Sequence, residues 1–224
     1  MTEMRVENEV KLVSDGGPFE YDEDPEKPLS LLRHALDSVG MTHDDYRMVR
    51  YHDEYFDDAA GTLTSRGVIL RYRDKGDSAF VTIKQPYVKD GLGLSRRETE
   101  TELFKARNLN IIGAVRDHAE RYLAVDGIME VPVLIDDIQR CQFRISSDVR
   151  RYKFCFDRII YRDPVTGICS DPSYELEIES LDQPIKDDRK MVALISELTD
   201  KYMFDEIKVS KFARGKAWLN SLTQ

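Results

Sequence analysis

The sequence has little cysteine and no long apolar run. Its three cysteines, Cys141, Cys155 and Cys169, form no CxxC pair, so neither a disulfide framework nor a clustered zinc site is expected. No stretch approaches the roughly 20 apolar residues that cross a bilayer, and the first residues lack the apolar segment of a signal peptide. We therefore expect a protein of the reducing cytoplasm with no membrane partner.

Common nucleotide-binding and metal-binding motifs are also missing. The sequence contains no GxxxxGK[ST] or GxGxxG loop, and no HxH or HxxxH pair occurs among its four histidines, which are His34, His43, His52 and His118. Basic residues are outnumbered, because 33 Lys and Arg stand against 42 Asp and Glu, for a net charge of −9. Duplex binding needs a dominant positive field, so we expect no nucleic-acid partner.

The composition that is present is that of a globular α+β protein. With 41% hydrophobic residues in 224, the chain can form one core, so we expect a single domain over residues 1–224. Strand patterns lie at about residues 4–13, 48–57, 67–74, 78–85, 94–103, 141–146, 149–162 and 173–181. Helical spacing predicts helices at about residues 28–39, 104–123, 187–202 and 211–221. The Gly-, Pro- and acid-rich segment 14–27 is expected to be an exposed loop.

Charged residues recur at every second position of six predicted strands, so each strand has a charged face. In the first strand, Glu7, Glu9 and Lys11 share one face with Arg5. The corresponding sets elsewhere are Arg71 and Arg73; Thr82 and Lys84; Arg96, Glu98, Glu100 and Glu102; Arg151, Lys153 and Asp157; and Glu175, Glu177 and Glu179. For one strand, a solvated face of a one-sided sheet explains this pattern. Across six strands, the near absence of uncharged polar residues favours the interior of a closed barrel.

A barrel interior lined by carboxylates and by Arg and Lys side chains has a specific chemistry. Buried charges are costly unless they are paired or neutralised by a ligand. Carboxylate oxygens suit hard divalent cations, and guanidinium and ammonium groups suit phosphate oxygens. The expected ligand is therefore a small triphosphate in complex with Mg²⁺ or Mn²⁺.

The charged strands resemble the motifs of the triphosphate tunnel metalloenzymes, also called the CYTH superfamily. The matching elements are Glu7-Asn8-Glu9-Val10-Lys11 for ExExK, Tyr55-Phe56-Asp57, Leu70-Arg71-Tyr72-Arg73, Thr82-Ile83-Lys84, Arg96-x-Glu98-x-Glu100, Glu177-Ile178-Glu179 and Ser210-Lys211-Phe212. They follow in the family's order between residues 5 and 215. Two positions depart from the pattern: Asp58 replaces a frequent threonine, and Arg150, Arg151 and Lys153 compete for the Lys-x-Arg positions of the sixth strand. Strand alternation favours Arg151 and Lys153.

The resemblance implies an eight-stranded antiparallel β-barrel, a tunnel with helices packed outside. It implies metal binding by Glu7, Glu9, Glu98, Glu100, Glu177 and Glu179. It also implies phosphate binding by Lys11, Arg71, Arg73, Lys84, Arg96, Arg151, Lys153 and Lys211. Lys11, Glu9 and Glu179 are the implied catalytic residues, with two Mg²⁺ or Mn²⁺ ions during turnover and a tunnel glutamate or Lys11 as the possible base. Glu102 shares one of these faces but is expected beyond the tunnel mouth, and whether Glu175 also lies beyond it is left open.

Three functions agree with these residues. The first is a metal-dependent phosphohydrolase that cleaves inorganic tripolyphosphate or a related small organic triphosphate. The second is a class IV adenylate cyclase, which converts ATP to cyclic AMP and pyrophosphate. The third is a non-catalytic sensor that binds polyphosphate or nucleotide, although a complete glutamate set argues against a pure binder. The partner is a small triphosphate in each case, and a monomer and a homodimer both remain open.

Overall fold

This computed structural model describes residues 2–86, 94–103, 110–180 and 188–223, and it leaves out the side chains of residues 5–8, 94 and 95. In these ranges, ten strands form one antiparallel sheet. The strands are β1 (Thr2–Ser14), β2 (Thr42–His43), β3 (Arg47–Phe56), β4 (Ile69–Asp74), β5 (Ala79–Pro86), β6 (Leu94–Leu103), β7 (Leu134–Ser146), β8 (Arg151–Arg162), β9 (Ser173–Ser180) and β10 (Asp205–Ile207). The helices are α1 (Glu26–Ser38), α2 (Thr62–Ser65), α3 (Ile111–Leu123), α4 (Arg189–Tyr202) and α5 (Lys211–Ser221), with a 3₁₀ turn at Gly17–Phe19.

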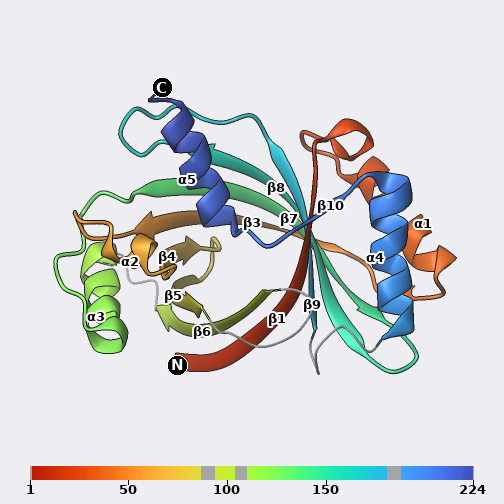
Figure 1. Cartoon of the computed structure of the whole chain (residues 1–224), viewed down its shortest axis with the longest axis horizontal. Coiled ribbons are helices and arrows are strands. Elements are labelled where there is room, and N and C mark those ends of the chain that lie inside the picture. Colours follow the sequence, from red (N-terminus) through yellow and green to blue (C-terminus); the bar gives the residue numbers. More distant parts are fainter. Residues whose placement is uncertain (1, 87–93, 104–109, 181–187, 224) are drawn as a thin grey trace.

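Strand pairing closes the sheet into a ring of eight strands (Figure 1). The order around the ring is β1, β6, β5, β4, β3, β7, β8 and β9, and β9 pairs with β1 again. Strand β1 makes this closure because Thr2–Glu9 pair with β6 and Glu9–Ser14 pair with β9. The expected eight-stranded antiparallel barrel is therefore confirmed for the ring, while the short strands β2 and β10 extend the sheet beyond the expected count.

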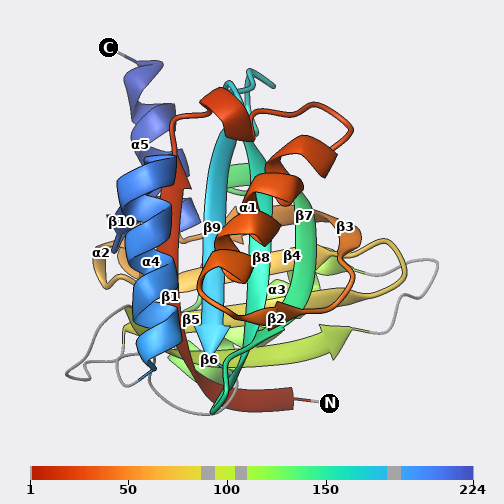
Figure 2. The ribbon, with the colours of Figure 1, turned by 90° about the vertical axis from the view of Figure 1, so that its right-hand side faces the viewer.

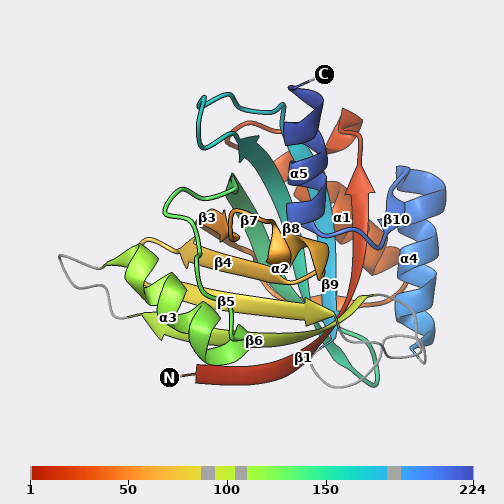
Figure 3. The same ribbon diagram turned by 60° about the vertical axis from the view of Figure 1, so that its left-hand side comes forward.

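Helices cover the outer face of the ring where its strands are apolar. Helices α1 and α4 lie beside β8 and β9 (Figure 2), and their leucines pack on Tyr152, Phe154 and Phe156 of β8. Helix α3 lies along β4 and β5 (Figure 3) and buries Val115 and Ala119 against them. The alternation in β8 thus places its aromatic residues outside the ring and leaves the other side of the strand facing inward. No helix in the described ranges is long and apolar enough to span a membrane.

Two expectations about elements need correction. Segment 14–27 is not a simple exposed loop, because Phe19 and Tyr21 are buried in the core under α1. Strand β7 begins at Leu134, several residues before the expected 141. Its first half contains Asp136 and Asp137, and aspartate is a residue type that disfavours strands. Asp136 is accommodated because its side chain belongs to an inward-facing site described below. Part of the helix expected from residue 104 lies outside the described residues, and α3 begins after the N-cap Asn110.

Helix α5 is held closely against the ring by its small residues and its cap. The Ser210 hydroxyl accepts a hydrogen bond from the backbone N–H of Ala213 at 3.2 Å, which caps the first turn. At Gly215, a Cβ atom would lie 2.5 Å from a methyl carbon of Leu134 and 2.7 Å from the ring of Tyr161. Glycine therefore allows the backbone of α5 to approach β7 and β8, and this approach brings Lys211 and Phe212 to the inside of the ring.

Candidate functional site

A cavity of about 110 Å³ lies inside the ring, bounded by side chains from the strands and from the start of α5. Nine basic side chains line it: Lys11, Arg71, Arg73, Lys75, Lys84, Arg96, Arg140, Lys153 and Lys211. Five carboxylates join them: Glu9, Glu98, Glu100, Glu177 and Glu179. The lining is therefore basic although the whole chain carries a net charge of −9, and this local excess of positive charge suits a polyanion.

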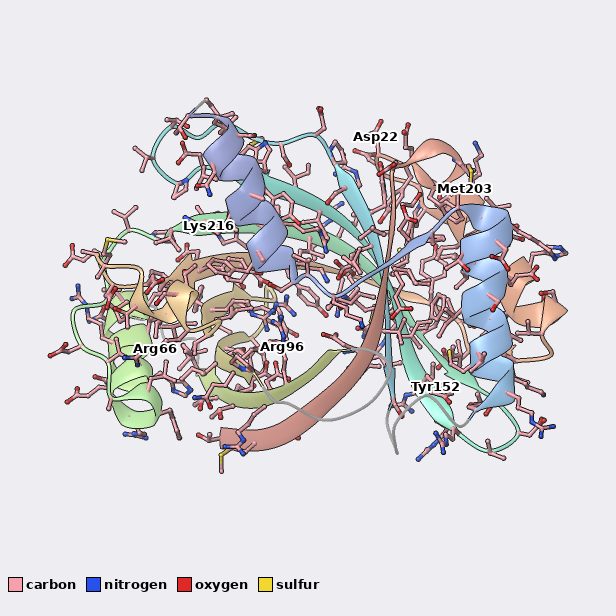
Figure 4. The ribbon with its side chains drawn as sticks, viewed as in Figure 1. Asp22, Arg66, Arg96, Tyr152, Met203 and Lys216 are labelled. Carbon is pink, nitrogen blue, oxygen red and sulfur yellow. The ribbon has the colours of Figure 1, made fainter. Side chains whose placement is uncertain are left out.

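The structure brings together almost all of the residues singled out in the sequence. Fourteen different residues were expected to bind phosphate or metal or to act in catalysis. Twelve of them line the cavity: Glu9, Lys11, Arg71, Arg73, Lys84, Arg96, Glu98, Glu100, Lys153, Glu177, Glu179 and, from α5, Lys211. Figure 4 shows Arg96 within the ring, whereas Tyr152 lies on the side of α4. The side chain of Glu7 lies outside the described residues.

Arg151 is the exception among the expected phosphate-binding residues. It is the first residue of β8, opposite Ser146, and its side chain is exposed and does not line the cavity. Strand alternation predicts which face of β8 a side chain lies on, but it does not predict how far along β8 the cavity extends. Lys153 is therefore the residue of this pair that reaches the site. Glu102 is exposed and outside the lining, as expected, whereas Glu175 is fully buried behind it.

Two arginines of β4 are anchored by an aspartate that the sequence analysis missed. Asp53 of β3 is fully buried and accepts two hydrogen bonds from Arg73, at 2.6 Å from Nε and 2.5 Å from Nη2. Arg71 lies 3.3 Å from the same carboxylate. Burial raises the pKa of Asp53, but the charges of Arg73 and Arg71 outweigh it and hold the pKa below its ordinary value. Asp53 thus stays ionised and fixes both guanidinium groups.

A second carboxyl group lies directly opposite Asp53, and its pKa is shifted in the opposite direction. Asp136 of β7 pairs in register with Asp53 and is fully buried. The Tyr55 hydroxyl donates a hydrogen bond to it at 2.8 Å. Burial and the nearby charge of Asp53 raise the pKa of Asp136 well above its ordinary value. The pair therefore holds one ionised and one proton-binding carboxyl group. Asp53, Tyr55 and Asp136 alternate inward on their strands, which is the signal that could have identified them.

At the α5 end of the cavity, acidic and basic groups neutralise one another. Lys11 and Lys211 both contact Glu175 and Glu177, and Lys211 Nζ also lies 3.1 Å from Asp157. Arg140 donates to Asp157 through Nε and Nη2, both at 2.6 Å, and Nη2 also contacts Glu177. Arg214 of α5 contacts Glu175. No pattern in the sequence indicated a role for Asp157, Arg140 or Arg214, and the role of Glu175 was left open.

These contacts bear on two expected roles, which remain predictions: Glu177 as a metal ligand and Lys11 as a base. Both oxygens of Glu177 are bonded to cationic groups, Oε1 to Lys11 and Lys211 and Oε2 to Arg140, so a metal ion at Glu177 would compete with these groups. Burial lowers the pKa of Lys11, but the charges of Glu177 and Glu9 outweigh it and raise the pKa well above its ordinary value. This raised pKa favours the ammonium form of Lys11 and does not support its expected role as a base.

The remaining carboxylates offer a donor set that fits a hard divalent cation. Glu9 of β1 and Glu179 of β9 are opposite one another in register, and Glu98 and Glu100 enter from β6. Lysine ammonium groups already lie near three of these carboxylates, at 3.1 Å for Lys11 and Glu9, 3.4 Å for Lys84 and Glu98, and 3.5 Å for Lys153 and Glu179. A metal ion bound there would share these carboxylates with the lysines. Asp157, Glu175 and Glu177 also have oxygens within 4.8 Å of one another, but Lys11, Lys211 and Arg140 already surround that group.

Comparison with known proteins agrees with this architecture. The family model described as CYTH domain matches residues 24–214. A solved structure from Hippeastrum, described as a candidate adenylyl cyclase with a dominant triphosphatase activity, is 20% identical with a TM-score of 0.58, and the match covers 94% of this chain and 95% of that one. A candidate adenylate cyclase from Bacillus halodurans is 19% identical with a TM-score of 0.50, covering 93% and 95%.

A protein from Pyrococcus horikoshii OT3 shares the fold as well, at 13% identity and a TM-score of 0.51, with 92% of this chain and 96% of that one covered. No protein with curated annotation matches the sequence. At such low identities the solved structures show a common fold, and the family is shown by the match over residues 24–214. This chain belongs to the CYTH domain family.

Proposed function

We propose that this protein is a divalent-metal-dependent phosphohydrolase, folded as a single domain, that cleaves inorganic tripolyphosphate or a related small organic triphosphate. The observation that carries the proposal is the cavity lining, in which nine basic side chains and five carboxylates converge inside a closed ring. Such a site neutralises phosphate oxygens with basic groups and leaves carboxylates for a cation. The CYTH family membership and the triphosphatase activity described for the Hippeastrum protein support the same reading.

Phosphate oxygens would be bound by the basic groups of the central part of the cavity. Arg71 is held by Asp53 and has a buried Nε atom with no hydrogen-bond partner, so it retains donor capacity. Lys84 of β5 and Arg96 of β6 approach from the neighbouring strands. Charge-assisted hydrogen bonds of this kind are roughly twice as strong as neutral ones, and an interior of low dielectric strengthens them further.

Mg²⁺ or Mn²⁺ would be held by Glu9, Glu98, Glu100 and Glu179, whose oxygens suit both ions. When bound, such an ion would neutralise phosphate charge and lower the pKa of a coordinated water. Glu100 already accepts a hydrogen bond from the Thr82 hydroxyl at 3.2 Å, which fixes the orientation of its carboxylate. A proton from the attacking water would go to a cavity glutamate such as Glu9 or Glu179.

Covalent catalysis by a side chain is not favoured by the geometry. Burial raises the pKa of Cys155, the cysteine that lines the cavity, so its thiol stays protonated. The Ser210 hydroxyl is used as the cap of α5. Phosphoryl transfer to water needs positioning and charge neutralisation rather than a protein nucleophile, and the cavity supplies both.

The test is product release from tripolyphosphate, ATP, thiamine triphosphate and pyrophosphate, each with Mg²⁺ and with Mn²⁺. We expect orthophosphate from at least one triphosphate and a loss of about 10²–10³ in kcat for Glu100→Gln, because a metal-oriented transition state loses a ligand. Glu102→Gln is the matched control, since Glu102 lies two residues further along the same face of β6 but outside the cavity.

The outcomes separate the candidate functions. Cyclic AMP and pyrophosphate from ATP would assign the protein to the cyclase chemistry instead. Binding of tripolyphosphate without any product, with either ion, would make it a sensor. Equal activity of the Glu100 and Glu102 variants would show that catalysis does not use this cavity.

A further inference from the structure

We propose that Lys75, the first residue after β4, is an additional substrate-binding residue that contacts the outermost phosphate, the one furthest from α5. The inference rests on the function proposed above and adds a residue outside every motif quoted for the family. Lys75 lies in the turn between β4 and β5, where its N–H donates to the carbonyl of Ser78 at 2.9 Å. Its side chain lines the cavity together with Arg71 and Arg73 of the preceding strand.

Most basic groups of the cavity are already neutralised by carboxylates. At the α5 end, Lys11, Lys211 and Arg140 are bonded to buried acidic groups. Further along β4, Arg73 is bonded through two atoms to Asp53. A polyanion gains little from a cation whose charge is already balanced by a buried partner. A cation without such a partner therefore contributes more to polyanion binding than a paired one of the same kind.

Lys75 is a cation of this kind. Among the residues that the structure describes, no carboxylate oxygen lies within 4.0 Å of its Nζ atom. Instead, Nζ lies 3.8 Å from the centre of the Phe80 ring and 5.8 Å from that of Tyr51. Two aromatic faces restrict where the ammonium group can lie and leave its charge uncompensated. The side chain is thus positioned at the cavity before a ligand arrives.

The charged groups around Lys75 also favour an anion. Burial lowers the pKa of Lys75, and the positive charges of Arg73, Arg71 and Lys153 lower it further. The negative charge of Glu100 on β6 raises this pKa but does not cancel the lowering. Arg71 and Arg73 each contact the carboxylate of Asp53, and Lys153 Nζ lies 3.5 Å from Glu179, so Lys75 is the member of this basic group without an ion-pair partner among the described residues. A phosphate group there would supply the counter-charge that Lys75 lacks. Arg96 likewise has no carboxylate partner within the described residues and approaches from β6, so the two cations lie on different sides of the same cavity.

The experiment compares wild type with Lys75→Gln, Lys75→Arg and the control Lys27→Gln, which removes an exposed lysine of α1. The dissociation constant for tripolyphosphate is measured by calorimetry in EDTA, and KM and kcat for tripolyphosphate are measured with Mg²⁺. We expect Lys75→Gln to raise the dissociation constant and KM by about tenfold, the effect of one charge-assisted hydrogen bond, with kcat within about twofold of wild type. Lys75→Arg keeps the charge and should restore both constants to within about twofold.

If Lys75→Gln keeps the dissociation constant and KM within about twofold of wild type, the assignment of Lys75 is wrong. The proposed function would remain intact. A tenfold rise that Lys75→Arg does not reduce would also overturn it, because charge would then not be the cause. Wild-type binding without turnover would reject the phosphohydrolase but retain Lys75 as a binding residue. Neither binding nor turnover in the wild type would reject both proposals.

Discussion

Two neighbouring aspartates in the cavity wall have opposite protonation behaviour because of what surrounds them. Asp53 contacts Arg71 and Arg73, whereas Asp136 contacts the neutral Tyr55 hydroxyl and faces the charge of Asp53. The same side chain is therefore stabilised as a carboxylate at one position and as a carboxylic acid at the next. This difference allows the two groups to be distinguished by amide substitutions of nearly equal size.

We expect Asp53→Asn to destabilise the protein by about 3 kcal/mol, because it leaves two buried guanidinium groups without their counter-charge. Asp136→Asn should instead be at least as stable as wild type at pH 8, because it mimics the protonated form. The pKa of Asp136 is raised in the folded state, so its contribution to stability is complete below its unfolded pKa and is lost as the pH rises through the folded pKa.

The difference in unfolding free energy between Asp136→Asn and wild type should therefore grow with rising pH, by at least about 1 kcal/mol. Urea unfolding of both proteins at pH 5 and pH 8 measures this change. Subtracting wild type from Asp136→Asn at each pH removes the contribution of Asp53, whose lowered pKa has the opposite effect on the pH dependence. A constant difference between the two pH values would mean that Asp136 is ionised in the folded protein throughout.

Most inward-facing residues could be predicted from alternation and motif order, but their partners could not. Glu9, Lys84 and Arg96 line the cavity as their positions in the strands indicate. Asp53 and Arg140 were missed because charged residues occupy both faces of β3 and β7, as Asp53 and Glu54 do, so no separate charged face stands out in these strands. Their role depends on which strands become neighbours, and β3 pairing with both β4 and β7 is a property of the closed ring.

At the scale of elements, α5 matters because it brings its first turn into the cavity. Lys211 and Phe212 line the site, and the Phe212 ring lies 5.0 Å from that of Tyr55. The helix can approach only because residue 215 has no side chain where Leu134 and Tyr161 lie. The sequence predicted this helix correctly, since residues 211–221 match its observed bounds. The close approach was not predictable, because it depends on partners from β7 and β8.

Gly215→Ala tests this contact. Alanine favours an isolated helix by up to about 1 kcal/mol, yet we expect a net loss of about 1–3 kcal/mol of stability, because the added methyl group overlaps buried side chains. The displaced first turn should also raise KM for tripolyphosphate. Thermal unfolding and steady-state kinetics measure both effects, with Asn220→Ala on the exposed side of α5 as the control. Increased stability with unchanged KM would show that α5 does not depend on this approach.

At the scale of the whole molecule, a basic cavity lies within a protein of net negative charge. Repulsion among the cavity cations opposes folding when no anion is present, and a bound polyanion should remove that cost. Ligands that bind only the folded state stabilise it, by about 2.7 kcal/mol at a hundredfold excess over the dissociation constant.

We therefore expect tripolyphosphate with Mg²⁺ to raise the thermal midpoint by roughly 5–10 °C for a chain of this size. Sulfate at equal ionic strength should have a much smaller effect, and EDTA should reduce the tripolyphosphate effect by removing the metal. Equal shifts with sulfate and tripolyphosphate would point to general screening of charge rather than to a site within the ring.

The closure of the ring also sets when the cavity can exist. Strand β1 closes it by pairing with β9, so residues 9–14 must meet residues 174–179, which are made much later during synthesis. Contacts between such distant segments slow folding, because the intervening chain must be ordered before they form. Until β9 emerges, the charged sides of β1 and β6 face water, where their hydrated charges oppose premature collapse and association. The charges that prepare the cavity for its ligand thus also protect the unfinished sheet.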